Sequence, residues 1–426
     1  MTTDTTIDNA SEDLKNLQER KIKNVYKNVF NNVEFYRNFY VKNGLNEDSM
    51  TDMEAFTKIP FFVKSFFKEN YPYGLLAVPM KDITRLHASS GTSGFPTIVA
   101  YTKNDIESWS NIIAQAFKGI GVDENSIVQN SFGYGLFTGG MGIHYGVEQV
   151  GATVIPASTG NTEKQVLLMK DLGADVITAT PSYLLHIYDY LIKENIPLES
   201  LSLTKALVGA EPWTEEMRKE IEEKLQIKAY DIYGLSEATG PGVAVECEYQ
   251  DGLHIFEESF YAEIINPKTG EVLPYGEEGE LVLTSLDKEA LPIIRYRTGD
   301  ITSLINEPCQ CGNHFIRMKK PTGRVDDMLI IKGVNVFPSQ IESVLLASGI
   351  ANPHYQVIVD RIDNNDTLTV RVEVDEKYNE NVFIEKLKAK LYSVLGIRFK
   401  IEFLPPLTIE RSEGKAKRLI DRRKKG

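Results

Sequence analysis

The sequence has little cysteine, no long apolar run and no excess of positive charge. Its 426 residues include only 3 cysteines, which excludes a disulfide-dense scaffold, and a chain of this length can bury a large core without such bonds. No stretch of about 18 uncharged apolar residues occurs, so we expect no membrane span. The formal net charge is −13, which argues against nucleic-acid binding because that function needs basic surface to release counterions.

The N-terminal sequence is polar and acidic, and it lacks the basic and then apolar pattern of a secretory signal peptide. We therefore expect a cytoplasmic protein. The composition, with 42% hydrophobic and 25% charged residues, is that of an ordinary folded protein. Its length predicts two to three domains, because a domain typically has about 100–200 residues.

The middle of the chain alternates between strand and helix patterns, after an amphipathic helix predicted at residues 11–42. Strands are predicted at residues 175–179, 205–209 and 230–233, and helices at residues 183–192 and 214–225. This alternation predicts a parallel sheet in an α/β layer. Ligands of such sheets bind beyond the carboxyl ends of the strands.

The pattern changes after about residue 250 and again after about residue 325. The first change gives β strands, predicted at residues 260–265 and 280–284; the second gives helices at 338–346 and 381–395 and strands at 356–359, 368–374 and 400–403. The predicted fold is a large N-terminal α/β domain with parallel sheets plus a small β region, residues 1–323, followed by a small α+β C-terminal domain, residues 324–426.

The most informative stretch is residues 89–97, where five side-chain hydroxyls and two glycines occur together. Glycines let successive amides face a common point, and hydroxyls add donors, so the stretch favours a phosphate-binding loop. No Gly-Lys-Ser/Thr ends it, so it is not a Walker loop. Read alone, a surface linker rich in glycine and serine is the alternative.

The three cysteines predict a metal site. Cys309 and Cys311 form a C-x-C pair, and Cys247 and His254 precede them by about 60 residues. Three thiolates and one imidazole would complete a closed tetrahedral zinc site with a structural role. His314 is the rival fourth ligand, and three unrelated buried cysteines are the alternative.

Further motifs follow the glycine and hydroxyl loop in a fixed order. They are Gly209-Ala210-Glu211-Pro212, Tyr233-Gly234-Leu235-Ser236-Glu237, Tyr296-Arg297-Thr298-Gly299-Asp300, Gly323-Arg324-Val325-Asp326-Asp327 and Ser412-Glu413-Gly414-Lys415. This ordered set resembles the adenylate-forming superfamily of acyl-CoA synthetases, peptide-synthetase adenylation domains and luciferases. Residues 134–140, 155–158, 180–183, 209–213 and 334–338 are similar to its phenylacetate–CoA ligase branch.

The resemblance implies an ATP-dependent acid–thiol ligase. Such an enzyme activates an aryl or arylacetic carboxylate as acyl-AMP and transfers the acyl group to coenzyme A, releasing AMP and pyrophosphate. The implied partners are a small carboxylic acid, ATP, Mg²⁺, structural Zn²⁺ and coenzyme A, with neither nucleic acid nor membrane; a homodimer is left open. The alternatives are an adenylating enzyme with a non-CoA acceptor and a non-catalytic zinc-bearing nucleotide-binding protein.

The resemblance also implies roles for particular residues. The nucleotide would be held by Ser89, Ser90, Gly91, Thr92, Ser93, Gly94, Gly209, Ala210, Glu211, Pro212, Asp231, Tyr233, Gly234, Ser236, Asp300 and Arg324, with Glu237 on Mg²⁺. Relatives often carry lysine where Phe95 stands, which removes one cation from the loop. The acyl group would lie among Phe132, Tyr134, Phe137, Gly140 and Met141.

The resemblance implies that the C-terminal domain is a mobile lid. Asp326 would be its hinge, and Lys332 and Gly333 would enter the site for the coenzyme A step. A carboxylate repels nucleophiles, so the protein's work is positioning and charge neutralisation. Lys415 would bridge the carboxylate and the α-phosphate as charge builds.

We predict that Lys415→Ala abolishes adenylate formation from acid and ATP but spares thioester formation from supplied acyl-adenylate. Loss of one preorganised donor lowers a rate by about 10²–10³. Measuring the two half-reactions separately checks this, with Lys417→Ala as the control for a nearby tail lysine. Equal loss of both half-reactions would refute the assignment of Lys415 to adenylate formation.

Overall fold

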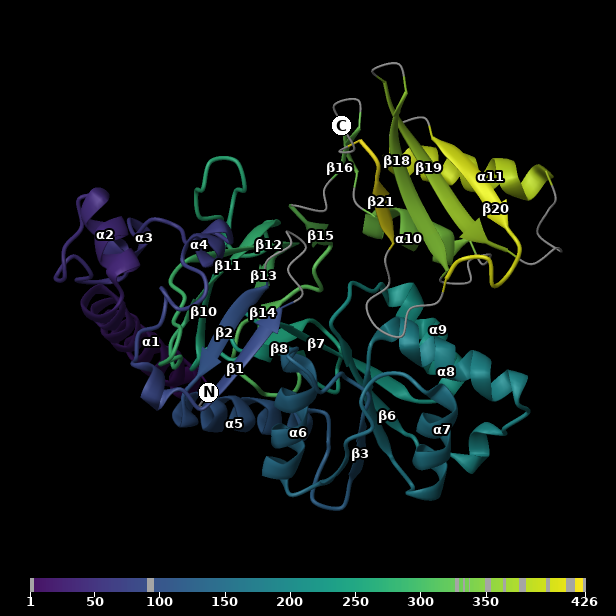
Figure 1. Cartoon of the computed structure of the whole chain (residues 1–426), viewed down its shortest axis with the longest axis horizontal. Coiled ribbons are helices and arrows are strands. Elements are labelled where there is room, and N and C mark those ends of the chain that lie inside the picture. Colours follow the sequence, from purple (N-terminus) through teal and green to yellow (C-terminus); the bar gives the residue numbers. More distant parts are fainter. Residues whose placement is uncertain are drawn as a thin grey trace. The chain divides into compact units, whose positions relative to one another are not determined.

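A computed structural model describes residues 4–89, 96–325, 329–331, 334–336, 338–348, 354–362, 365–374, 381–395, 399–410 and 418–423. These residues belong to two compact units. Figure 1 shows the chain coloured along its sequence. Unit 1 comprises Met1–Ser158, Ala174–Thr178 and Tyr230–Lys320, and unit 2 comprises Thr159–Gly173, Ala179–Ala229 and Pro321–Gly426.

The main sheet has nine strands and mixed topology. Its order is β13 (Leu304–Ile305), β14 (Arg317–Met318), β9 (Leu253–Ile255), β8 (Gly240–Glu246), β7 (Lys228–Leu235), β6 (Lys205–Gly209), β5 (Val176–Ala179), β3 (Ile127–Asn130) and β4 (Thr153–Ile155). β3 pairs in parallel with β4 and β5, whereas β8 pairs antiparallel with β7 and β9. The predicted α/β class with parallel strands is confirmed.

Helices alternate with these strands, as the sequence pattern predicts. They are α5 (Lys103–Gly119), α6 (Thr138–Val150), α7 (Thr162–Asp171), α8 (Pro181–Lys193) and α9 (Glu215–Leu225). α5 begins with a capping box between Thr102 and Asp105. In α6, a Cβ at Gly142 would lie 2.1 Å from the Trp109 ring and one at Gly146 would lie 2.1 Å from Ile113, so the glycines let α5 and α6 approach closely.

Unit 1 also contains a hairpin and antiparallel strands. The hairpin joins β1 (Arg85–Ser89) and β2 (Thr97–Tyr101), with Ser89 opposite Thr97. The antiparallel strands β10 (Phe260–Ile265), β11 (Gly279–Ser285) and β12 (Tyr296–Thr302) lie in this order in a second sheet, and β15 (Gly323–Arg324) belongs to unit 2. The predicted strands at residues 260–265 and 280–284 correspond to β10 and β11.

The N-terminal helix differs from its prediction. Instead of one helix over residues 11–42, the structure has α1 (Asp4–Asn32) and α2 (Glu34–Lys42), interrupted at Val33, which is extended with φ −117°. The break folds α2 back, so that Tyr26 and Tyr40 stack with ring centroids 5.0 Å apart. The short helices α3 (Met53–Thr57), α4 (Ser65–Glu69), η1 (Met80–Asp82) and η2 (Leu198–Ser200) complete the set.

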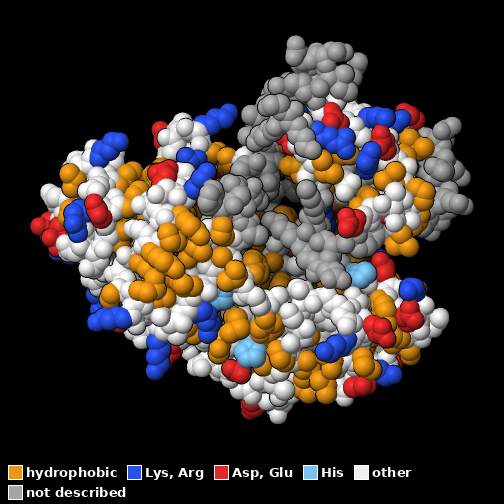
Figure 2. Space-filling view, viewed as in Figure 1, with side chains coloured by type: hydrophobic (Ala, Val, Ile, Leu, Met, Phe, Trp, Pro, Cys, Tyr) orange, Lys and Arg blue, Asp and Glu red, His pale blue; other side chains and the backbone are white. Residues whose placement is uncertain are grey.

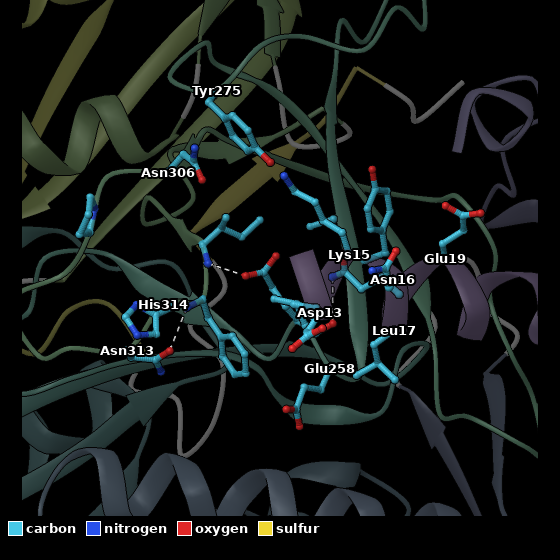
Figure 3. Close-up of a pocket in the computed structure, with 18 of the residues that line it drawn as sticks. Asp13, Lys15, Asn16, Leu17, Glu19, Glu258, Tyr275, Asn306, Asn313 and His314 are labelled. Atoms are coloured by element: carbon cyan, nitrogen blue, oxygen red, sulfur yellow. Dashed lines mark hydrogen bonds between the residues drawn. The ribbon is translucent and has the colours of Figure 1, made fainter. Parts of the chain in front are cut away.

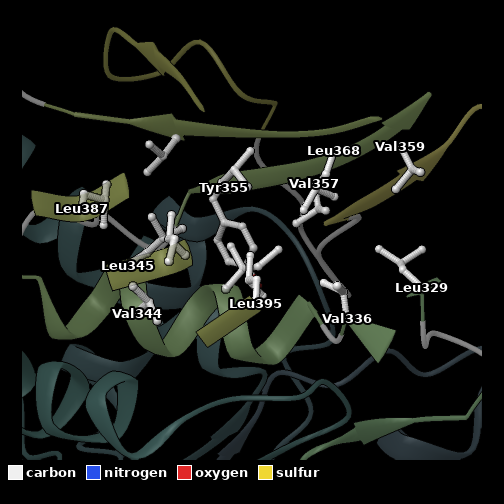
Figure 4. Packing of buried hydrophobic residues seen from close by; sticks show 14 of the residues in the cluster. Leu329, Val336, Val344, Leu345, Tyr355, Val357, Val359, Leu368, Leu387 and Leu395 are labelled. Atoms are coloured by element: carbon white, nitrogen blue, oxygen red, sulfur yellow. The ribbon is translucent and has the colours of Figure 1, made fainter. Parts of the chain in front are cut away.

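The C-terminal part of unit 2 has its own hydrophobic core (Figure 4). Its elements are β16 (Leu329–Ile331), β17 (Val334–Val336), α10 (Pro338–Ala347), β18 (Tyr355–Ile362), β19 (Asn365–Glu373), α11 (Asn381–Leu395), β20 (Lys400–Leu404) and β21 (Leu419–Asp421). The sheet order is β20-β19-β18-β21. Val357, Val370 and Leu391 are fully buried, so the alternating strands and the amphipathic helices share one interior.

Hydrophobic side chains also reach the surface. Leu136 and Phe137, between β3 and α6, are 68% and 42% exposed, and the view in Figure 2 shows hydrophobic side chains gathered over the part of unit 1 that contains α4 and β10. In the described part of the chain, every helix is too short or too polar to cross a bilayer.

Candidate active site

The β1–β2 hairpin carries the glycine and hydroxyl loop at its tip. Ser89 ends β1 and Thr97 begins β2, with Thr97 buried; Ser90, Gly91, Thr92, Ser93 and Gly94 lie outside the described residues. Two bonds tie β1 to the segment before α6, because the Ala88 amide donates to the Leu136 carbonyl at 2.9 Å and His87 Nδ1 lies 3.0 Å from the same oxygen.

His87, the central residue of β1, is buried. Burial lowers the pKa of its imidazole, against the opposing hydrogen bond that the Leu136 carbonyl accepts. Its ring packs edge-on against Tyr101, with centroids 5.5 Å apart. These contacts join β1 to β2 and to the segment before α6.

Glu237 and Ser236 lie in the turn between β7 and β8. The amides of Ala238 and Thr239 both donate to the Leu235 carbonyl at 3.2 Å, which closes the turn. Ser236 Oγ lies 3.1 Å from Thr138 Oγ1, at the first residue of α6. Glu237 follows Ser236 in this turn and is only 7% exposed. A carboxylate in this position offers the hard oxygen donor that Mg²⁺ prefers.

Asp300 and Tyr233 form a polar pair from β12 and β7. The Tyr233 hydroxyl donates to Asp300 Oδ2 at 2.5 Å, and the Asp300 amide donates to Thr298 Oγ1 at 3.0 Å. Two side chains that we expect to hold the nucleotide are therefore in direct contact. An ionised carboxylate has about four acceptor positions, so Asp300 can accept further hydroxyls while it keeps this bond.

Asp231 and Gly234 have structural contacts in β7. The Asp231 amide donates to Glu246 at 2.7 Å, and its carboxylate lies 3.8 Å from Lys320 Nζ. A Cβ at Gly234 would lie 2.1 Å from the Gly240 carbonyl oxygen, so glycine is required there for β7 and β8 to approach each other.

The Gly209-Ala210-Glu211-Pro212 motif follows β6 in unit 2. Ala210 has a positive φ of 70°, a conformation that turns the chain sharply after the strand. The Glu211 carboxylate accepts from the Ser182 amide at 2.7 Å, which ties the turn to the start of α8. Arg324, also in unit 2, lies in β15 and is half-buried.

The expected acyl-site residues gather around Asn130, which the sequence reading missed. Asn130 Nδ2 donates to the Tyr134 hydroxyl and to the Gly140 carbonyl, each at 2.8 Å. The Tyr134 hydroxyl also lies 3.1 Å from His144 Nδ1, and burial raises the pKa of Tyr134 to about 12. A polar residue that closes a buried parallel strand, as Asn130 closes β3, is the signal that could have found it.

Gly140 stays a predicted acyl-site residue. A Cβ there would lie 2.4 Å from the Gly133 carbonyl oxygen. The space beside Gly140 is therefore filled by the chain itself. Phe132 is buried, Met141 is half-buried and Phe137 is exposed, so these side chains can form only part of an acyl pocket wall.

Lys415, Asp326, Lys332 and Gly333 lie outside the described residues. The two chain positions that flank residues 411–417 are well fixed, however. Before them, the buried Glu373 carboxylate accepts from the amides of Leu407 and Ile409, at 3.0 and 2.6 Å.

After residues 411–417, Arg418 is held by a buried polar cluster. Its guanidinium forms an ion pair with the Glu342 carboxylate and lies 5.0 Å from the Tyr355 ring centroid. The Tyr355 hydroxyl donates to Glu342 at 3.2 Å. Losing either partner of such a buried pair leaves an uncompensated charge, so Arg418 is held firmly at the start of β21.

The cysteines and His254 converge, as their spacing predicts. Cys247 Sγ lies 3.7 Å from Cys309 Sγ, and Cys311 Sγ lies 3.4 Å from His254 Nε2. All four ligand atoms lie within 4.8 Å of one another. His254, rather than His314, belongs to this cluster, because β9 pairs with β14 and places His254 opposite Arg317. The donor set is the one that tetrahedral structural zinc takes.

A cavity of about 980 Å³ lies beside the cysteine loop (Figure 3). Its walls include Asp13 and Lys15 of α1 on one side and Asn313 and His314 on the other. At its edge the buried Glu257 carboxylate accepts from the Ile316 amide at 2.6 Å, and burial raises the pKa of Glu257. The residues that line it include none of those assigned to the nucleotide or the acid.

Two family models match the chain. The AMP-binding enzyme model matches residues 14–286, and the AMP-binding enzyme C-terminal domain model matches residues 333–423. The chain therefore belongs to the AMP-binding enzyme family. Within this adenylate-forming superfamily, it falls in the phenylacetate–CoA ligase branch, as the following relatives show.

The relatives match over nearly the full length of both chains. The phenylacetate–coenzyme A ligase of Pseudomonas putida is 45% identical over 98% of this chain and 96% of that protein, and that of Thermus thermophilus is 43% identical over 97% of each. Among solved structures, 2-hydroxyisobutyryl-CoA ligase in its postadenylation state matches with a TM-score of 0.88 and 25% identity, over 95% of this chain and 88% of that one.

We predict that Asp300→Asn raises the KM for ATP about 10- to 100-fold while the KM for the acid changes less than about twofold, since charge-assisted hydrogen bonds contribute about 1.5–3 kcal/mol each. Steady-state kinetics with each substrate varied checks this. Tyr233→Phe keeps the carboxylate and removes one donor, so we expect a smaller effect on ATP. Equal changes in the two KM values would contradict a ribose role.

Proposed function

We propose that the chain is an AMP-forming carboxylate–CoA ligase that activates an aryl or arylacetic acid, with phenylacetate as the preferred substrate. The supporting observation is the 43–45% identity to phenylacetate–coenzyme A ligases over 97–98% of the chain. ATP, the acid and coenzyme A are its substrates, and AMP and pyrophosphate are released with the acyl thioester.

In the first step, a carboxylate oxygen attacks the α-phosphorus of ATP and pyrophosphate leaves. The loop between β1 and β2 would hold the leaving phosphates, Glu237 would hold Mg²⁺ on them, and Asp300 would accept the ribose hydroxyls. Lys415 would neutralise the charge that develops between acid and α-phosphate. The arrangement in unit 1 supports this, because the hairpin, the Glu237 turn and the Asp300–Tyr233 pair are joined by the contacts described above.

In the second step, the thiol of coenzyme A attacks the acyl carbon and AMP leaves. We propose that residues 324–426 act as a domain that rotates between the steps, with Asp326 as the hinge and Lys332-Gly333 entering for thioester formation. Rotation needs a few boundary residues that absorb a change in φ and ψ. The separate hydrophobic core around Val357 and Leu391 supports this proposal.

We also propose that Cys247, His254, Cys309 and Cys311 bind one structural Zn²⁺. The four ligand atoms are already gathered, and His254 Nδ1 lies 3.3 Å from the Phe315 carbonyl, which orients the ring so that Nε2 faces the thiols. Four protein ligands leave no position for a substrate or water. The zinc would therefore support the loop after β13 and take no part in the chemistry.

The function is tested by pyrophosphate release from the full chain with phenylacetate, benzoate, 2-hydroxyisobutyrate and acetate, each with and without coenzyme A. We expect phenylacetate to have the highest kcat/KM, and mass spectrometry to find phenylacetyl-CoA. Pyrophosphate release that coenzyme A does not change, with no thioester formed, would favour another acceptor. No release with any acid would favour a nucleotide-binding protein.

The zinc site is tested by the metal content of the purified protein. We expect about one equivalent of zinc in the wild type, less than half an equivalent in His254→Asn, and an unchanged content in His314→Asn, a control at the histidine that lies between β13 and β14. His254→Asn should also melt at a lower temperature, because binding free energy of a structural metal contributes to folding. Less than half an equivalent in the wild type would refute the site.

A further inference from the structure

The residue that ends the phosphate hairpin is a fully buried tyrosine. Tyr101, the last residue of β2, donates its hydroxyl to the Thr239 carbonyl at 2.8 Å. Thr239 follows Glu237 by two residues, in the same turn between β7 and β8. One side chain thus joins the strand that leaves the phosphate loop to the turn that carries the proposed Mg²⁺ ligand.

A tryptophan makes a second, parallel connection. Trp109 of α5 stacks on Tyr101 with ring centroids 5.2 Å apart and an interplanar angle of 13°. Its Nε1 donates to the Pro241 carbonyl at 2.8 Å. A Cβ at Gly240 would lie 2.3 Å from the indole, so the start of β8 rests directly on this ring. The turn is held at two carbonyls, one on each side of Gly240.

The tyrosine ring also contacts a buried lysine from the segment that leads to Asp300. Lys288 Nζ lies 3.2 Å from the Tyr101 ring centroid, and among the described residues it has no hydrogen-bond acceptor. Burial lowers the pKa of Lys288 to about 7, against the attraction of Asp105. The Asp105 carboxylate accepts from the amides of Glu289 and Ala290, at 2.6 and 3.0 Å, so α5 fixes the segment on which Lys288 lies.

We propose that Tyr101 and Trp109 are positioning residues that set the Glu237 carboxylate relative to the phosphate hairpin and thereby determine how strongly Mg²⁺ supports ATP binding and adenylate formation. The inference rests on the proposed function of Glu237 and of the hairpin. Both aromatic side chains are buried, at 0% and 2% exposure. They act through the backbone carbonyls of the turn, and Lys288 holds the Tyr101 ring in place.

The geometry separates this role from general support of the fold. Tyr101 contacts the turn by a single hydroxyl, which can be removed while the ring and its stacking are kept. Tyr26 provides a matched control: it is also buried, also stacks on an aromatic ring, Tyr40, and also donates its hydroxyl to a backbone carbonyl, that of Asn46 at 2.7 Å. Tyr26 lies in α1, away from the hairpin and the Glu237 turn.

The experiment compares Tyr101→Phe, Tyr26→Phe and the wild type in a Mg²⁺ titration of phenylacetate-dependent ATP–pyrophosphate exchange. We expect Tyr101→Phe to raise the Mg²⁺ concentration for half-maximal exchange about three- to tenfold, the effect of one hydrogen bond, with the KM for phenylacetate within about twofold. Tyr26→Phe should leave the Mg²⁺ requirement within about twofold, whatever it does to the melting temperature. Equal shifts in both variants, or a lower melting temperature of Tyr101→Phe with an unchanged Mg²⁺ requirement, would overturn the proposal.

Calorimetry of ATP binding with Mg²⁺ and with EDTA gives a readout that needs no acid. In the wild type we expect Mg²⁺ to tighten ATP binding, and in Tyr101→Phe we expect most of that gain to be lost while binding in EDTA is unchanged. If no acid supports exchange, the proposed function fails, but this measurement still decides the inference. A gain from Mg²⁺ that is the same in wild type and Tyr101→Phe would refute the positioning role.

Discussion

The indole of Trp109 packs so closely against Gly142 of α6 and Gly240 of β8 that neither position can carry a Cβ. Steric exclusion of this kind is stiff, because an interior at crystal-like density has no free space into which atoms can shift. The contact therefore fixes α6 and β8 against α5 at the same time. Thr138 begins α6, and Ser236 lies in the turn that leads to β8. The packing of Trp109 against α6 and β8 therefore sets the distance between the Thr138 and Ser236 hydroxyls.

Contacts with distant residues, rather than hydrogen bonds within the turn, thus determine where the Glu237 carboxylate lies. Glu237 is in a turn whose own backbone bonds reach only to Leu235, and a turn held by such bonds alone can tilt as a body. The bonds from Tyr101 and Trp109 come from residues more than 130 positions earlier in the chain. A catalytic carboxylate gains preorganisation from such distant support, because its position does not have to be adjusted when substrate binds.

Much of the fold could be predicted from the sequence because helices and strands follow local periodicity. The strand at residues 205–209 and the helix at 381–395 were predicted with the bounds that the structure gives. The break at Val33 was missed, since no proline or glycine marks it; it follows from the stacking of Tyr26 on Tyr40, a contact between two helices. The β1–β2 hairpin was missed as well, because its strands are short and the loop between them was interpreted by its chemistry alone.

The candidate site was predicted at the level of motifs and less well at the level of contacts. Residue order placed Asp300 and Tyr233 in one site, but nothing in the sequence indicates that the tyrosine hydroxyl donates to the carboxylate. The choice between His254 and His314 likewise depends on the register of β9 with β14, which is a long-range property. Tyr101 and Trp109 were overlooked because a single buried aromatic residue has no pattern that distinguishes it from ordinary core.

The role that we propose for Lys415 poses a different physical problem, because the lysine would have to be accurately placed in the first step and absent from the site in the second. Buried carboxylates fix the chain on both sides of residues 411–417. Glu373 accepts hydrogen bonds from two amides before this segment, and Glu342 forms an ion pair with Arg418 after it. Both attachments lie on the same sheet and helix framework as Val357. A lysine fixed at both flanks of its segment would move with the whole C-terminal domain rather than by itself, so that one rotation both withdraws it and brings the Lys332-Gly333 segment forward.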